Sequence, residues 1–297
     1  MRGFLRPLAW WRLLGPDLSP RFPPGQEHPW RLAGRLVFVG DREFVVREAG
    51  EAEAPALLLI HGLNGSSLAE WYEVGPRLGG PFRLILIDHR NHGVSASSRD
   101  RYEIEEAADD IAGVLIAIGV SPLAVAGYSM GGVIAQALVH RHPGLVERMV
   151  LIGTFTHHPQ PLKAVRQAFA YLTRTWERAT GWGTPDVRTW YLIKSGAVDR
   201  RHQRWLWEET HRRDPGTGYQ ASSALFRFDS RPYVASLTIP ALVVIPSRDQ
   251  LVPPVWQYEL AASLPNAQIL ELYGAKHEAP WTHPEVIAKG MLDFLNQ

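Results

Sequence analysis

Six short runs of apolar residues recur along this chain of 297 residues, and they restrict its fold more than any other feature. Each run is too short for a helix and lacks alternation of apolar and polar residues, so we expect strands buried on both faces. Parallel strands in a helix-covered sheet meet that requirement. The runs are Ala56–Ile60, Leu84–Ile87, Leu123–Ala126, Met149–Ile152, Ala241–Ile245 and Ile269–Leu272.

The segments between these runs have the character of helices. From Ile104 to Ile118, apolar residues repeat at intervals of four and three, which places them on one helix face. Helices are also expected over Met130–His140, Val255–Leu264 and Val286–Leu295, and a β-hairpin over Leu36–Val39 and Phe44–Val46. The alternation predicts the α/β class, with a mostly parallel sheet flanked by helices.

The strand rhythm stops between residues 155 and 235, a stretch rich in arginine and tryptophan. We interpret this stretch as a helical cap, or lid, inserted between the sixth and seventh strands. The core is then expected to comprise residues 34–154 and 236–297, with residues 1–33 as an amino-terminal arm.

The first 14 residues combine leucine and tryptophan with three arginines, Arg2, Arg6 and Arg12. These charges interrupt the apolar stretch that a signal peptide or a membrane span needs. The segment is expected either to pack on its own domain or to make weak contact with a membrane surface. A cytoplasmic location is the corresponding expectation.

Composition excludes several classes of function. Lys plus Arg is 31 and Asp plus Glu is 30, so the chain lacks the basic excess of a typical nucleic-acid-binding protein. With 0 cysteines, a disulfide framework, a thiol nucleophile or a zinc–thiolate site is impossible. His157 and His158 lack a carboxylate at metal-ligand spacing, and we expect no metal and no organic cofactor.

The strongest local motif is Gly127-Tyr128-Ser129-Met130-Gly131, which follows a predicted strand and precedes a predicted helix. A serine at such a tight turn projects its hydroxyl as a nucleophile, and the crowded turn requires glycine on both sides. At this motif the chain resembles the α/β-hydrolase family, and Gly132 extends the match to the common G-x-S-M-G-G form.

A nucleophilic serine needs a base and an orienting carboxylate, which in this fold follow it in the order acid, then histidine. Asp249 comes after the strand Ala241–Ile245, and His277 comes after the strand Ile269–Leu272. Both positions are at carboxyl ends of strands, where open α/β sheets build their sites. Ser129, Asp249 and His277 are therefore the predicted catalytic residues.

The resemblance also implies an oxyanion hole made of backbone N–H groups. One donor is expected from Met130 and the second from Leu63 in the His61-Gly62-Leu63 loop. The segment Asp88–Ser95 resembles a further motif of the family in the form found in small serine esterases. Its polar residues, like His61, are expected to organise loops.

The sequence thus predicts a serine hydrolase that acts on carboxylic esters or related small acyl substrates without a cofactor. C–C bond hydrolases, lactonases, thioesterases and perhydrolases share the same triad and remain open, as does a small-molecule sensor with slow turnover. The apolar cap suggests an acyl or aromatic substrate. Its tryptophans are candidate substrate contacts, although they could equally be ordinary packing: Trp176, Trp182, Trp190, Trp205 and Trp207.

Overall fold

The computed structural model describes residues 22, 25, 27–98, 100–159, 171–172, 175–176, 183–212 and 218–297. The expectations for residues 1–14 and for Trp182 fall outside these residues. Within the described part, no helix has both the length and the apolar character needed to cross a membrane.

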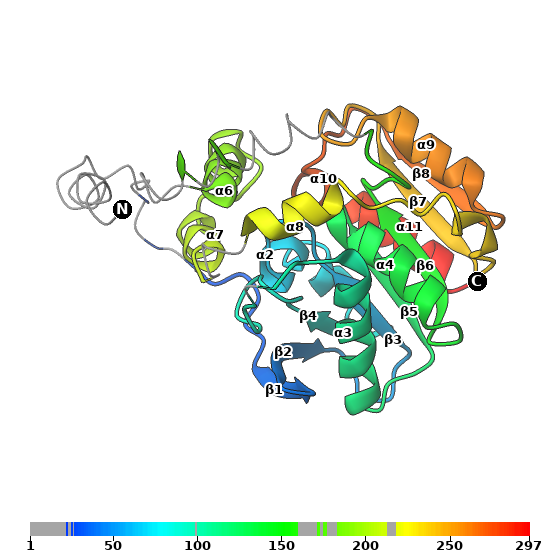
Figure 1. The fold of residues 1–297 in the computed structure, drawn as a ribbon. Helices are drawn as coiled ribbons and strands as arrows, with labels where there is room; N and C mark the ends of the chain where they lie inside the picture. Colours follow the sequence, from blue (N-terminus) through cyan, green and yellow to red (C-terminus); the bar gives the residue numbers. More distant parts are fainter. Residues whose placement is uncertain are drawn as a thin grey trace.

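An eight-stranded sheet forms the centre of the molecule, with the order β1-β2-β4-β3-β5-β6-β7-β8 (Figure 1). β1 pairs antiparallel with β2, and β2 pairs antiparallel with β4. The remaining neighbours are parallel, which confirms the predicted α/β class. The strands are β1 (Gly34–Val39), β2 (Arg42–Ala49), β3 (Ala56–Ile60), β4 (Arg83–Ile87), β5 (Leu123–Tyr128), β6 (Val146–Ile152), β7 (Ala241–Pro246) and β8 (Ala267–Leu272).

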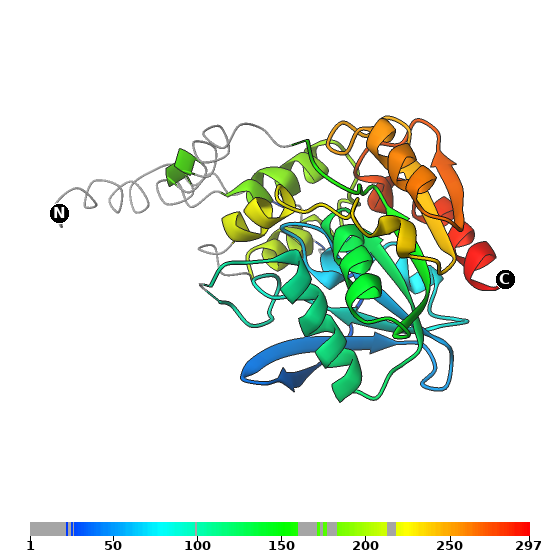
Figure 2. The ribbon, with the colours of Figure 1, turned by 45° about the vertical axis from the view of Figure 1, so that its right-hand side comes forward.

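Helices cover both faces of this sheet (Figures 1 and 2). The α-helices in the described ranges are α2 (Ser67–Trp71), α3 (Ile104–Ala117), α4 (Met130–Arg141), α6 (Thr184–Lys194), α7 (Gln203–Thr210), α8 (Gly218–Leu225), α9 (Pro254–Ser263), α10 (Ala279–Thr282) and α11 (Pro284–Leu295). Two short 3₁₀ helices, η1 (Gly75–Arg77) and η2 (Val234–Ser236), complete the described elements.

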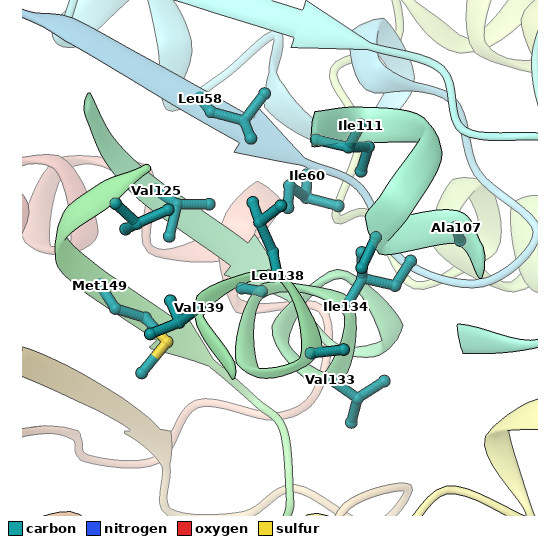
Figure 3. Close-up of a cluster of buried hydrophobic side chains, with 14 of the residues drawn as sticks. Leu58, Ile60, Ala107, Ile111, Val125, Val133, Ile134, Leu138, Val139 and Met149 are labelled. Carbon is teal, nitrogen blue, oxygen red and sulfur yellow. The ribbon is translucent and has the colours of Figure 1, made fainter. Parts of the chain in front are cut away.

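The core divides into two layers because successive residues of a strand point to opposite faces of the sheet. In β3, Leu58 and Ile60 belong to the apolar cluster that includes residues of α3, α4 and α9, whereas Leu57 and Leu59 belong to the cluster that includes residues of α2 and α11. Figure 3 shows the first layer around Leu138 of α4. The central strands are buried on both faces, as their apolar runs predicted.

β8 is the exception to that prediction. Only Leu272 of this strand is buried, and the Ile269 side chain is 51% exposed. β8 lies at the edge of the sheet, with β7 as its strand neighbour. The apolar run correctly marked a strand, but its position at the edge leaves much of it uncovered.

Helices α6, α7 and α8 come between β6 and β7 in the chain, and they lie together on one side of the molecule (Figures 1 and 2). Leu192 of α6 and Leu206 of α7 join the second core layer, and Ala221 and Ala224 of α8 join the first. These helices are thus packed onto the α/β core by buried apolar side chains.

Candidate active site

Ser129 lies at the sharp turn between β5 and α4. Its backbone has φ +53° and ψ −117°, a conformation that L-residues rarely adopt and that costs about 1–3 kcal/mol. The flanking glycines allow this turn: a Cβ on Gly127 would lie 2.3 Å from the Gly131 carbonyl oxygen, and one on Gly131 would lie 2.2 Å from that of Ile60. The glycine spacing in the motif therefore follows from close backbone contacts.

Three predicted residues that are distant in sequence meet at this turn. His277 Nε2 lies 3.1 Å from Ser129 Oγ, and His277 Nδ1 lies 2.7 Å from Asp249 Oδ2. The carboxylate of Asp249 is completely buried, while the His277 side chain is 10% exposed. This arrangement has the connectivity of nucleophile, base and orienting acid.

Local hydrogen bonds fix Asp249 and His277 in place. Asp249 Oδ1 accepts the N–H groups of Leu251 and Val252 at 2.9 and 2.8 Å. The Tyr128 hydroxyl, beside the nucleophile in sequence, donates to the carbonyl oxygen of His277 at 2.9 Å. Burial raises the pKa of Tyr128, so its phenol stays protonated as this donor.

The predicted oxyanion loop lies beside Ser129. A Cβ on Gly62 would come within 3.2 Å of Ser129 Cβ, and Leu63 lines the same cavity as Ser129. Met130 is the first residue of α4, and the first N–H groups of a helix have no partner within the helix. Both predicted donor residues are therefore next to the nucleophile.

Asp88 organises the loops beneath the site. It accepts the Ser67 N–H and hydroxyl at 2.7 and 2.6 Å and pairs with Arg47 at 3.1 Å. Burial alone would raise its pKa, but Arg47, His61 and Ser67 outweigh burial and lower it. The expected loop-organising role of this residue agrees with these contacts.

His61 has a similar structural environment. Burial lowers its pKa, so its ring is neutral near pH 7. Nδ1 lies 2.9 Å from the Gly62 carbonyl oxygen, and Nε2 accepts the His89 N–H at 3.3 Å. Since both ring nitrogens are occupied in holding two loops together, the contacts favour the structural role over that of a second base.

A cavity of about 630 Å³ opens above Ser129 and His277. Most of its wall is apolar, and part of that wall comes from the segment between β6 and β7. The side chains contributed by this segment are Phe155, His158, Val187, Arg188, Tyr191, Leu225 and Phe226. The cavity is large enough for a small organic ligand.

The four described tryptophans among the candidate substrate contacts lie away from this cavity wall. Trp205 and Trp207 are each 7% exposed and packed within the protein, whereas Trp176 and Trp190 are 58% and 41% exposed. Trp205 and Trp207 therefore fit the interpretation that these tryptophans pack within the protein. The apolar lining of the cavity comes from other residues of the same segment. Helices present several faces, and the sequence alone did not indicate which face met the cavity.

Among the described residues, no group of three or more His, Asp or Glu side chains could hold a metal ion. The chemistry that this arrangement can carry is nucleophilic attack by a hydroxyl, assisted by an imidazole.

The sequence profile of the alpha/beta hydrolase fold matches residues 55–284, which is most of the chain. The chain belongs to the alpha/beta hydrolase fold family. This membership confirms the resemblance drawn from the motifs around Ser129.

Individual relatives are more distant. A Serratia proteamaculans protein, provisionally named carbamate hydrolase RutD, is 29% identical over 247 residues, covering 82% of this chain and 91% of that protein. The enol-lactonase from Burkholderia xenovorans LB400 is 26% identical with a TM-score of 0.74, covering 89% of this chain and all of that one. A thermophilic esterase from Thermogutta terrifontis has a TM-score of 0.75 at 21% identity, covering 90% of this chain and 98% of that one, and shows the shared fold.

Several residues at the site carried no signal in the sequence. Tyr128 appeared only as the variable position of the serine motif, and Glu70 and Arg188 belong to no motif. The one local indication was Ser66, whose hydroxyl caps α2 by accepting the Ala69 N–H at 3.2 Å. That cap could have revealed the short helix carrying Glu70.

Proposed function

We propose that this protein is a serine hydrolase that cleaves carboxylic esters through an acyl-enzyme on Ser129. The continuous contact from Asp249 through His277 to Ser129, at 2.7 and 3.1 Å, carries this proposal. Those distances fall within the range for proton transfer and for orientation of the base.

In the first half of the reaction, Ser129 Oγ attacks the acyl carbon while His277 Nε2 takes the hydroxyl proton. The backbone N–H groups of Leu63 and Met130 hold the oxyanion of the tetrahedral intermediate. Collapse of the intermediate breaks the ester C–O bond, and His277 gives its proton to the departing alkoxide. Asp249 keeps the imidazole oriented and stabilises its positive charge.

In the second half, His277 removes a proton from water, whose oxygen attacks the acyl-enzyme. The second tetrahedral intermediate collapses, the carboxylic acid leaves, and Ser129 regains its proton from His277. These steps need no metal or organic cofactor.

We further propose that residues 155–235 act as the cap and that the substrate is a small, largely apolar acyl compound. Two features support this: the apolar side chains of Phe155, Val187 and Phe226 in the cavity wall, and the pairing of Arg188, which also lines the cavity, with a buried carboxylate. An acyl chain can bury apolar surface in such a cavity, whereas a multiply charged substrate would lose hydration against a wall that is mostly apolar.

The deciding experiment compares the purified protein with Ser129→Ala on p-nitrophenyl acetate, butyrate and hexanoate. Removal of a nucleophile in such a triad lowers kcat by about 10⁴- to 10⁶-fold, and we expect a loss in this range. Ser263→Ala is a matched control, because the Ser263 hydroxyl on α9 donates to the Glu259 carbonyl oxygen at 2.7 Å and is not among the described residues that line the cavity. A fluorophosphonate should add covalently to the parent protein and to Ser263→Ala, but not to Ser129→Ala. Equal hydrolysis by Ser129→Ala and the parent protein would disprove the proposal.

Lactones and carbamates are the next substrates to test. One similar structure is that of an enol-lactonase, and one similar protein is named as a carbamate hydrolase. Lactones and carbamates both contain an acyl carbon that the same serine can attack. A panel of p-nitrophenyl carbamates and five- and six-membered lactones, compared by kcat/KM with the simple esters, separates these substrates.

A further inference from the structure

Glu70 holds the backbone of the predicted oxyanion loop. Its Oε2 accepts the Gly62 N–H at 2.7 Å, one residue before Leu63, and its side chain is fully buried. Hydrogen bonds from N–H groups to a carboxylate are short and stronger than those between neutral groups. The position of this carboxylate therefore restricts where the Gly62–Leu63 backbone can lie.

The other oxygen of Glu70 is held by a helix from the segment between β6 and β7. Arg188 Nη2 on α6 lies 2.6 Å from Glu70 Oε1, although the two residues are 118 positions apart. The guanidinium group of Arg188 also lies over the Trp281 ring, 5.0 Å from its centre. The same carboxylate thus joins α6 to the loop beside Ser129.

Helix α2, which carries Glu70, has a second bond to these inserted helices. The hydroxyl of Ser66, the residue that caps α2, donates to Glu209 Oε1 on α7 at 2.9 Å. α2 is therefore bonded to α7 at its start and to α6 near its end. A shift of α6 and α7 would be transmitted to the short helix that holds the oxyanion loop.

We propose that Arg188 is a positioning residue, which acts through Glu70 to align the Leu63 N–H with the developing oxyanion when α6 is docked on the core. The inference rests on the proposed serine hydrolase function. Arg188 lines the cavity, but its charge is neutralised by Glu70, so a role in binding an anionic substrate is less favoured. Its contribution is expected in kcat, because a misplaced donor weakens a contact that strengthens in the transition state.

The test compares Arg188→Met with Arg204→Met. Arg204 is an exposed arginine on the neighbouring helix α7 that pairs with Glu208, so the control removes the same charge and a surface ion pair. On p-nitrophenyl butyrate, Arg188→Met should lower kcat about 10- to 100-fold and change KM less than about threefold. This loss in kcat is smaller than the loss that follows removal of a whole oxyanion-hole donor. Arg188→Lys should restore part of kcat, and Arg204→Met should resemble the parent protein.

Arg188→Met leaves the Glu70 carboxylate buried without its cation and could impair folding. Glu70→Gln combined with Arg188→Met avoids this, because both new side chains are neutral and Gln can still accept the Gly62 N–H. If the two residues act as one unit, the double variant loses less kcat than the product of the two single losses. Multiplicative losses would contradict the proposal.

Hydrogen–deuterium exchange measured by mass spectrometry gives a readout that needs no substrate. Peptides spanning residues 61–71 should exchange faster in Arg188→Met than in the parent protein and in Arg204→Met. Unchanged exchange, unchanged kcat, or a rise in KM alone would each overturn the positioning role. Full activity of Ser129→Ala would instead remove the proposed function, and the exchange result would still show whether Arg188 orders the loop.

Discussion

The two walls of the cavity are built in different ways. The core wall carries Ser129 and His277 at the carboxyl ends of strands, and buried hydrogen bonds fix both Asp249 and the backbone of His277. The opposite wall comes from inserted helices, where Val187 and Tyr191 are 52% and 43% exposed. The core wall thus carries the residues proposed for the chemistry, whereas the helical wall supplies mostly apolar side chains, together with Arg188, which is bonded to Glu70. Apart from Arg188, we expect side chains of the helical wall to alter the choice of substrate and side chains of the core wall to alter the reaction.

The most severe way to test the core wall is Asp249→Asn. The Asn oxygen can keep the bonds from Leu251 and Val252, while its NH₂ group faces His277 and favours the wrong imidazole tautomer. We expect kcat for p-nitrophenyl butyrate to fall about 10³- to 10⁴-fold with little change in KM. Steady-state kinetics measures this effect, and circular dichroism verifies the fold.

A loss of less than tenfold in Asp249→Asn would mean that Asp249 does not orient the base. In that case the division between a chemical core wall and a substrate-selecting helical wall would need revision.

The helical wall is tested by Phe226→Ala, which removes an apolar ring from the cavity. We expect kcat/KM for p-nitrophenyl hexanoate to fall about tenfold, because a long acyl chain loses buried contacts. The acetate ester should change less than about twofold.

Phe38→Ala is the matched control, since that ring is 62% exposed on β1 and lies outside the cavity. Equal losses for acetate and hexanoate in Phe226→Ala would show that this wall does not select acyl length.

The smallest expected effect concerns the buried histidines below the core wall. Burial, followed by the nearby His61 and His92, holds the pKa of His89 well below its ordinary value. The unfolded chain binds a proton at this residue near pH 6.5, whereas the folded protein does not, so stability is present above about pH 6.5 and falls in acid.

His89→Phe should therefore make the free energy of unfolding less dependent on pH between 6.5 and 5. The slope should change by at most about 1.4 kcal/mol per pH unit, which corresponds to one proton. Urea titrations at pH 8, 6.5 and 5 measure the free energy of unfolding of both proteins. The difference between them at pH 8 gives the loss of packing, which is subtracted at the lower pH values. Parallel curves for both proteins would contradict the assignment.

Local features of the sequence were sufficient to predict the sheet and the three site residues. The apolar runs marked β3 to β8, and for the central strands the reason is that they are buried on both faces and show it in their composition. Ser129 was recognisable from its flanking glycines, which the turn requires sterically. Asp249 and His277 were found by their position after β7 and β8, since carboxyl ends of parallel strands meet at one edge.

The residues that shape the cavity were harder to predict. Trp205 was a candidate substrate contact but packs in the core, whereas Phe226, which the sequence did not single out, lines the cavity. The exposed face of β8 was also missed, because an apolar run does not reveal whether a second sheet neighbour exists.

The sequence by itself determined where the strands lie, which serine occupies the tight turn and which acid and histidine follow the later strands. These features depend on local backbone preferences and on short-range steric contacts, which the residue types record directly. Only the tertiary structure decided that Arg188 meets Glu70 and that Phe226, Leu225 and Val187 line the same cavity as Ser129. Such contacts depend on how separate helices dock on the sheet, and the orientation of docking arises from packing over the whole molecule.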